Sequence, residues 1–428
     1  MNKGYLAVLA SILLVLSSHA QREPDRVYST SIRSVKLHPT TDPLGYPIIA
    51  LNSSDQLTLR FDDLSAGVKN YFYSLTLCNA DWSPAQMNYF DYIKGYSQVR
   101  IATYRNSSIS LTRYTHYEAV LPDRNCVPFR SGNYLLKVFL NGDTSRLAFT
   151  RRLMVIDQRL PAAVQILQPF DQQLFSTHQR LRITLDTKSM DVRYPQQQLK
   201  LIVLQNNRWD NALALSAPTF IRNSVLEYNN EQQLTFPATK EFRWLNLRSF
   251  RLLGDRIRRQ ENSDSSFVLF AKEDLPRLPR QYFYYKDING MCLYETVEQI
   301  NPFWNADYAK VHLTLRPPEG KPYGNNEVVV MGELTQYGKD PAATMVYNAE
   351  KGTYETDLLL KQGYYDYMYA LRNTNAGKEW FDTTPIEQNA WETENSYLLL
   401  VYYRQLGGRY DELIAVRTVS SQINRTLQ

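Results

Sequence analysis

The chain has 428 residues and a formal net charge of +5 at pH 7, with 43% hydrophobic and 21% charged residues. These values are typical of a globular protein rather than a disordered one, and the mild charge does not indicate a nucleic-acid-binding protein. The length allows two or three domains, each with its own core. Tyrosine is unusually frequent, with 31 residues, which favours β-strands and surfaces that are partly apolar and partly wet.

The first 20 residues have the pattern of a secretory signal peptide. Lys3 supplies a positive charge, an uncharged apolar stretch runs from residue 5 to residue 16, and Ser18-His19-Ala20 ends in a small residue suited to cleavage. The apolar stretch is too short to span a bilayer. We therefore expect residues 1–20 to be cleaved and the mature, exported chain to start at Gln21, with no transmembrane segment. A buried N-terminal helix is the alternative.

Alternation of apolar and polar residues at a period of two predicts β-strands along most of the chain. In the N-terminal third, strands are predicted at 56–61, 71–77, 134–140 and 146–156. The last two flank Asn141-Gly142, a pair that accepts the positive φ angles of a tight hairpin turn. Further strands are predicted at 199–204, 327–331, 354–360, 364–371 and 397–403. No window of twelve residues shows an apolar stripe at helical spacing, so the sequence predicts an all-β fold.

Two segments have the features of domain boundaries. The first follows Asp157, where Arg159-Leu160-Pro161 begins a new segment. The second is 316–322, in which Pro317 and Pro318 remove strand hydrogen-bond donors and stiffen the chain. We therefore expect three tandem β-sandwich domains, at 27–157, 158–316 and 323–424.

Three cysteines are an odd number for an exported protein. Cys78 and Cys126 both lie in the first third and could pair, which would leave Cys292 free. The sequence does not fix the distance that a disulfide needs, and three buried thiols are the favoured interpretation.

Recognisable motifs for catalysis or metal binding are missing from the sequence. The histidines that remain after cleavage are not in metal-ligand spacing: His38, His116, His178 and His312. There is no nucleophile elbow, phosphate-binding glycine loop or calcium loop. We expect His116, between aromatic residues, to be structural, and we expect no catalytic residues, metal or cofactor. A pair of carboxylates that meet only in space, as in glycoside hydrolysis, is the enzymatic alternative.

Two segments are candidates for binding. Asp81 beside Trp82 suggests a sugar site, but the favoured interpretation is that Asn79 and Asp81 stabilise a turn and Trp82 closes a core. The segment 240–259 holds seven basic residues against two acidic ones, with aromatic residues between them. The favoured interpretation of this segment is a solvated strand face. The alternative is a docking surface for an acidic protein or an anionic lipid headgroup. Its candidate partner-binding residues are Arg243, Trp244, Arg248, Arg251, Arg256, Arg258 and Arg259.

An ordered set of short motifs spans nearly the whole mature chain. In the first third they are 70–73, Cys78-Asn79-Ala80-Asp81-Trp82, Tyr114-Thr115-His116-Tyr117, Ser131-Gly132-Asn133-Tyr134 and 151–155. Later ones are 205–211, Glu241-Phe242-Arg243, Asp287-Ile288-Asn289-Gly290, 361–365, 392–395 and 401–404. Together they resemble the type IX secretion system plug proteins. One departure is 237–240, which lacks the small Gly or Asn residues expected before Glu241.

The resemblance implies a periplasmic protein, peripheral to the inner face of the outer membrane. It would bind the outer-membrane β-barrel translocon of the type IX secretion system and occlude its pore, without catalysis, nucleic acid or a small-molecule substrate. The last segment also resembles immunoglobulin-like, early-set sandwich modules that bind glycogen and starch. Its loop 333–337 carries no Trp on which sugars could stack. A secreted carbohydrate-binding protein is therefore the alternative function.

Overall fold

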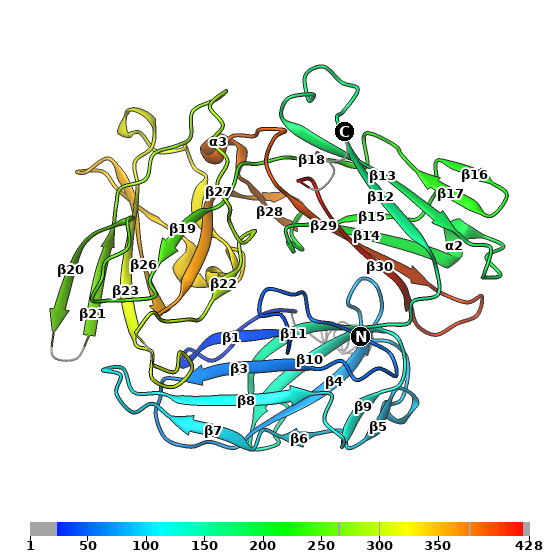
Figure 1. Ribbon diagram of the computed structural model, residues 1–428, viewed down its shortest axis with the longest axis horizontal. Coiled ribbons are helices and arrows are strands. Elements are labelled where there is room, and N and C mark those ends of the chain that lie inside the picture. The colour runs from blue at the N-terminus through cyan, green and yellow to red at the C-terminus, as the bar shows by residue number, and fades with distance from the viewer. Residues whose placement is uncertain (1–23, 264–265, 299, 376–377, 423–428) are drawn as a thin grey trace, which may run out of the picture.

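The computed structural model describes residues 24–263, 266–298, 300–375 and 378–422. The predicted signal peptide and the start at Gln21 lie outside these residues. Almost all regular structure in the described part is β-strand, which confirms the all-β prediction. The strands form three β-sandwiches arranged as a triangle, with the first sandwich at the bottom of Figure 1.

The first sandwich contains two sheets, with strand orders β1-β3-β8-β7 and β2-β11-β10-β4-β6, beside a small β5-β9 ladder. Its elements are β1 (Ile32–Pro39), β2 (Ile48–Ala50), β3 (Leu57–Asp63), β4 (Tyr71–Cys78), η1 (Tyr89–Asp91), β5 (Ile93–Gly95), β6 (Val99–Arg100), β7 (Thr103–Asn106), β8 (Thr115–Leu121), β9 (Cys126–Pro128), β10 (Gly132–Leu140) and β11 (Leu147–Ile156). Along β4, Tyr71, Tyr73 and Leu75 are buried while the residues between them are partly exposed. This is the period of two that predicted the strand.

The hairpin between β10 and β11 turns at the predicted place. Asn141 has φ 55° and Gly142 has φ 72°. Two consecutive positive φ angles match the twist of the flanking strands, and Asn-Gly adopts them at low cost.

The second sandwich combines two distant parts of the chain. Its sheets have the orders β12-β13-β17-β16, with β18 beside β13, and β15-β14-β29-β30. Its elements are β12 (Ala162–Leu167), β13 (His178–Asp186), α2 (Pro195–Gln198), β14 (Leu199–Gln205), β15 (Leu213–Leu215), β16 (Phe220–Arg222), β17 (Val225–Tyr228), β18 (Thr235–Pro237), β29 (Ser396–Tyr403) and β30 (Glu412–Ser420). One core contains side chains from both parts, from Leu160 to Phe236 and from Tyr397 to Ala415.

The third sandwich lies between these two parts in the sequence. One sheet is built on β27, which pairs with β19, β22, β24 and β28, and the other has the order β20-β21-β23-β26-β25. Its elements are β19 (Arg243–Asn246), β20 (Ile257–Ser263), β21 (Ser266–Ala271), β22 (Cys292–Leu293), β23 (Tyr308–Leu315), η2 (Pro318–Gly320), β24 (Glu327–Met331), η3 (Glu333–Thr335), η4 (Pro341–Ala343), β25 (Val346–Asn348), β26 (Thr353–Lys361), β27 (Tyr364–Asn375), β28 (Lys378–Asp382) and α3 (Thr384–Glu387).

The strand pairing does not follow the predicted division into 158–316 and 323–424. β14 pairs with β29 over seven residues, which joins the predicted middle domain to the end of the chain. Pro317 and Pro318 lie where the chain crosses from β23 in one sheet to β24 in the other sheet of the same sandwich. The prolines end a strand there, as expected from their chemistry, but they do not separate two cores.

All three cysteines are free and buried, so Cys78 and Cys126 do not form a disulfide. This agrees with the favoured interpretation of the sequence. None of the helices in the described part of the chain is long and apolar enough to cross a membrane.

Candidate functional site

The basic segment 240–259 is only partly available to a partner. Arg243 is buried on β19, where it forms ion pairs with Asp274 at 2.8 Å and with Glu387 at 3.0 Å. Arg256 also contacts Asp274 and donates a hydrogen bond to Tyr367. Burial works to raise the pKa of Asp274, but the charges of Arg243 and Arg256 outweigh it and lower that pKa. Both arginines therefore take part in an ion-pair network within the third sandwich. Arg243 is buried and is not available to a partner, whereas Arg256 is partly exposed and its prediction as a partner-binding residue stays a prediction.

The other five predicted residues of this segment face outward to different degrees. Trp244 packs edge-to-face on Tyr285, with ring centroids 4.8 Å apart, and is partly buried. Arg248 forms an ion pair with Glu295 at 3.2 Å. The exposed members of the predicted set are Arg251, Arg258 and Arg259. They stay candidates for contact with a partner.

Trp82 lies between the first and second sandwiches rather than at the surface. Only 5% of Trp82 is exposed, and its ring packs edge-to-face on Trp209 at 5.4 Å. The guanidinium of Arg152 lies 4.9 Å from the Trp82 ring and 4.4 Å from the Trp209 ring. Asp81 accepts a hydrogen bond from the main-chain N–H of Ser83, as the turn interpretation predicts. A buried Trp82 offers no stacking surface for a sugar.

Apolar residues continue this contact on both sides. In the first sandwich they include Leu135, Met154 and Ile156, and in the second Leu204 and Leu400. β30 of the second sandwich runs against β10 and β11 of the first (Figure 1). The sheet that contains β10 and β11 is therefore covered on both faces. The two sandwiches therefore share one continuous apolar interface.

The first and third sandwiches meet through buried charges. Asp62 on β3 accepts hydrogen bonds from Lys361 on β26 and from Tyr308 on β23, each at 2.6 Å. The ring of His116 contacts the other oxygen of Asp62 at 2.6 Å and stacks on Phe303. Burial works to raise the pKa of Asp62, but the charge of Lys361 outweighs it and lowers that pKa. His116 thus has a place in an interface network, in line with the structural role expected for it.

The two chain segments that connect the second and third sandwiches are held by hydrogen bonds between side chains and the main chain. Gln179 donates hydrogen bonds to the carbonyl oxygens of Trp391 and Thr393, at 2.8 and 2.9 Å. Thr239 has φ 54°, in the left-handed region, and its N–H donates to Asn389. The turn before Glu241 therefore does adopt the conformation for which Gly or Asn would be expected, although a Thr occupies it.

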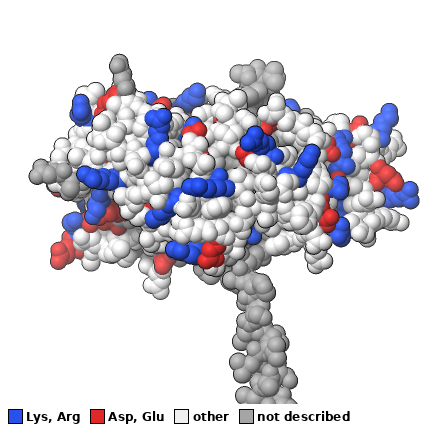
Figure 2. Space-filling model, turned by 90° about the horizontal axis from the view of Figure 1, so that it is seen from below, with Lys and Arg blue, Asp and Glu red and all other residues white. Residues whose placement is uncertain are grey.

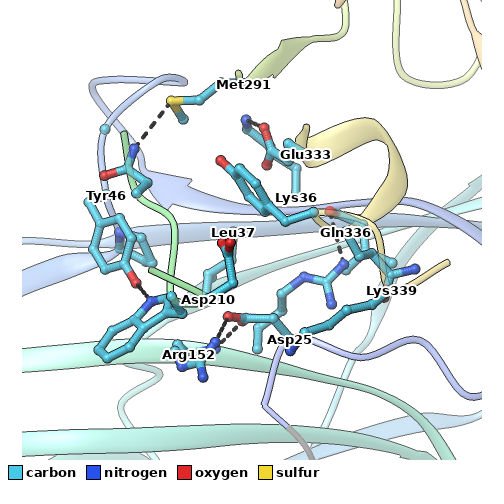
Figure 3. A pocket seen from close by; sticks show the side chains of 17 residues that line it. Asp25, Lys36, Leu37, Tyr46, Arg152, Asp210, Met291, Glu333, Gln336 and Lys339 are labelled. Atoms are coloured by element: carbon cyan, nitrogen blue, oxygen red, sulfur yellow. Dashed lines mark hydrogen bonds and ion pairs between the residues drawn. The ribbon is translucent and has the colours of Figure 1, made fainter. Parts of the chain in front are cut away.

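A cavity of about 130 Å³ lies where the three sandwiches meet (Figure 3). The first sandwich supplies Lys36, Tyr46, Arg151 and Arg152, and Asp25 comes from the segment before β1. The second supplies Trp209 and Asp210, and the third supplies Met291, Glu333, Gln336 and Tyr337. Trp209 donates a hydrogen bond to Tyr46 at 2.5 Å, which joins two sandwiches at the rim of the cavity.

Charges around the cavity are mostly paired. Lys36 contacts Glu333 at 2.5 Å and donates to the carbonyl oxygen of Cys292 at 2.9 Å. Burial works to raise the pKa of Glu333, but the charge of Lys36 outweighs it and lowers that pKa. Arg152 pairs with Asp25. The residues that line the cavity are spread along the sequence from Asp25 to Lys339. Nothing in the sequence therefore indicated this site.

A pair of buried carboxylates lies elsewhere in the third sandwich. Asp287 accepts hydrogen bonds from main-chain N–H groups of Phe242 and Asn289, and Asp366 from those of Ile288 and Gly290. Burial raises the pKa of Asp287 to about 7 and that of Asp366 to about 8, and the charge of Asp287 adds to the shift of Asp366. Among the described residues, no group of three His, Cys, Asp or Glu is suited to hold a metal ion.

The outer face of the first sandwich carries scattered charge. In Figure 2, Lys and Arg side chains are spread over this face, with Asp and Glu between them. They do not gather into a single basic patch. This face therefore offers no concentrated site for a polyanion.

Comparisons with known proteins identify the chain. No curated protein matches it. Residues 32–157 match the model of the type 9 secretion system plug protein first domain. The crystal structure of a hypothetical protein from Parabacteroides merdae is similar over 94% of this chain and 100% of its own, with 30% identity and a TM-score of 0.88. The match of the first sandwich agrees with the ordered motifs, and the chain belongs to the family of type IX secretion system plug proteins.

Proposed function

We propose that this protein is a non-enzymatic periplasmic plug that binds the outer-membrane translocon of the type IX secretion system and occludes its pore from the periplasmic side. The family membership supports an association with type IX secretion. The mechanism requires binding only, with no bond made or broken.

The observation that carries the proposal is the way the three sandwiches are joined. Two pairs of sandwiches share buried contacts, through Trp82 and Trp209 and through Asp62 and Lys361, and Gln179 holds the segment that connects the third sandwich to the second. A body that closes a wide pore must resist deformation as a unit, and domains that share only small polar contacts generally move relative to one another. The buried aromatic and ionic contacts favour a single rigid body of the kind that occlusion needs.

The proposal is tested by the permeability of the outer membrane. In a strain that makes the translocon but lacks this protein, we expect increased uptake of a large antibiotic or dye. Restoring the intact chain should reduce uptake, and the translocon should co-purify with the tagged protein from cell envelopes. Unchanged permeability in the deletion strain, with the translocon present and free of cargo, would exclude occlusion and leave an adaptor or assembly role.

A variant that weakens the contact between the first and third sandwiches tests whether the plug must be rigid. Lys361→Ala removes the cation from Asp62 and should increase uptake if the third sandwich must stay fixed to the first. The matched control is Lys351→Ala, because Lys351 forms an exposed ion pair with Glu355 in the same region. If the Lys361 variant is folded and seals as well as the control, rigidity of this contact is not needed.

The surface that meets the translocon is proposed to include the exposed basic residues Arg251, Arg258 and Arg259. Arginine anchors are frequent among the residues that dominate protein interfaces. Replacing all three by Glu should weaken co-purification with the translocon while leaving the melting temperature unchanged. Equal recovery of the translocon with the variant and the intact chain would place the contact elsewhere.

A further inference from the structure

Within the described part of the chain, the guanidinium of Arg151, at the cavity between the three sandwiches, forms hydrogen bonds only to carbonyl oxygens. Arg151 donates hydrogen bonds to the carbonyl oxygens of Thr150 at 2.8 Å and Val35 at 3.4 Å. No carboxylate of the described residues forms an ion pair with it, whereas Lys36 and Arg152 each have one. A guanidinium has five N–H donors, so Arg151 has unused capacity to bind an anion. Burial lowers the pKa of Arg151, and the charges of Asp25 and Glu333 offset this only in part.

The neighbouring Arg152 adds a second positive charge to the cavity wall. Its Nε–H is buried and has no hydrogen-bond partner, although another nitrogen of the group contacts Asp25. This Nε–H is shielded by the Trp82 and Trp209 rings on which the guanidinium lies, so Arg152 contributes its charge to the cavity wall rather than a free donor. Arg151 and Arg152 are adjacent on β11, and both line the same space.

The remaining walls of the cavity are largely apolar. Pro47 and Trp209 contribute to them, together with Leu37 and Met291 (Figure 3). A cavity that combines an apolar body with a few polar groups is the usual form of a small-molecule site. Its volume of about 130 Å³ is similar to that of cavities that accept a single benzene-sized ring.

The loop that closes the cavity from the third sandwich has an uncommon backbone. Gln336 and Tyr337 both have φ 53°, a region that residues other than Gly and Asn rarely adopt. Strained conformations of this kind persist where surrounding structure fixes them, and they are concentrated at ligand-binding sites. Gln336 is held by the main-chain N–H of Val27, which donates to its side-chain oxygen at 2.9 Å.

We propose that this junction cavity binds a small organic carboxylate with an apolar or aromatic body. The carboxylate accepts hydrogen bonds from Arg151, and the body packs against Trp209 and Met291. Such a ligand contacts all three sandwiches and stabilises their arrangement. The inference does not depend on the plug function, because it concerns a site inside the protein rather than its outer surface.

Binding is tested with the purified mature chain and two pairs of probes, benzoate with benzamide and butyrate with butyramide. Each amide matches the size of its acid but lacks the charge. We expect at least one carboxylate to bind at least about tenfold more tightly than its amide by isothermal titration calorimetry, and to raise the melting temperature. This comparison needs no substitution, so it holds whether or not a variant folds.

The variant Arg151→Gln should lose the preference for the acid, whereas Arg146→Gln should keep it. Arg146 is an exposed arginine on the same hairpin and serves as the matched control. Equal binding of acid and amide, or equal binding by the Arg151 variant and the intact chain, would overturn the assignment. No binding of either acid up to about 10 mM would also overturn it, because water alone would then occupy the cavity.

Discussion

The first sandwich contacts the second mainly through aromatic and apolar side chains, whereas it contacts the third mainly through buried charges. At the first contact Trp82 and Trp209 pack edge-to-face among Leu and Met side chains. At the second, Asp62 is surrounded by Lys361, His116 and Tyr308. The apolar contact tolerates small shifts, because packing is not directional. The charged contact fixes one register, because each partner must be in place to offset the cost of desolvation.

This difference suggests distinct roles for the two interfaces. Apolar burial supplies most of the free energy that holds the first two sandwiches together. The charged cluster adds little net stability, because the free-energy cost of desolvating the charges offsets their attraction. Removing one partner is nevertheless strongly destabilising, because it leaves the other charge buried and unpaired. The third sandwich is therefore positioned with high specificity and is the one that a change of charge can release.

The largest effect is expected at the apolar interface. Trp82→Ala removes a buried ring together with its contacts to Trp209 and Arg152, and should lower the free energy of unfolding by about 4 kcal/mol. The measurement is urea unfolding followed by Trp fluorescence and circular dichroism. The loss should be the same at low and high salt. A loss below about 1 kcal/mol would mean that the two sandwiches are not held together by this packing.

At the charged interface, Lys361→Ala should cost about 3 kcal/mol, because it leaves Asp62 buried with less compensation. The double variant Asp62→Asn with Lys361→Met should cost less than the single one, since it removes both charges. Unfolding of the two variants by urea gives the comparison. A double variant less stable than the single one would show that the ion pair itself supplies net stability.

The sequence predicted individual strands well and their assembly poorly. The predicted strand 327–331 coincides with β24, and 397–403 differs from β29 by one residue. These strands follow from local alternation. The pairing of β14 with β29 depends on contacts across nearly 200 positions, and no local pattern encodes it.

The same limit applies to the candidate site. Arg243 alternates with Leu245 and Leu247, so its burial could have been inferred from the period of two. Its partners Asp274 and Glu387 lie 31 and 144 positions away, so the ion pairs could not have been inferred. The junction cavity requires the docking of three sandwiches, and its residues carry no motif.

Asp366 is a buried carboxylate without an ion pair among the described residues, whereas Asp62 is paired with Lys361. The contributions of the two carboxylates to stability should therefore depend on pH with opposite signs. The pKa of Asp62 is lowered, so its stabilising contribution is present above pH 4 and is lost as the pH falls through the folded-state pKa. The pKa of Asp366 is raised to about 8 from 3.8, so the folded state retains a proton that the unfolded state releases. Its contribution is therefore present below about pH 4 and is lost as the pH rises towards 8.

Asp366→Asn should remove this dependence. The free energy of unfolding of the variant minus that of the intact chain should be larger at pH 8 than at pH 5 by about 3 kcal/mol, measured by urea titrations of both proteins at the two pH values. Asp382→Asn serves as a control outside the buried pair. If the two pH values give the same difference between the Asp366 variant and the intact chain, Asp366 is ionised throughout this range.

The smallest effect is expected for an ion pair of the same chemical type at the surface. Lys351 contacts Glu355 at 3.0 Å, but 61% of the Lys351 side chain is exposed, against 2% for Lys361. Water and salt screen the exposed charges, and both side chains lose entropy when they pair. Lys351→Ala should therefore change the free energy of unfolding by less than about 0.5 kcal/mol, and less again at high salt. Both lysines pair with a carboxylate, Lys351 just before β26 and Lys361 at its last residue. The ratio of the two losses therefore measures what burial adds. A loss at Lys351 as large as that at Lys361 would show that burial is not what distinguishes the charged interface.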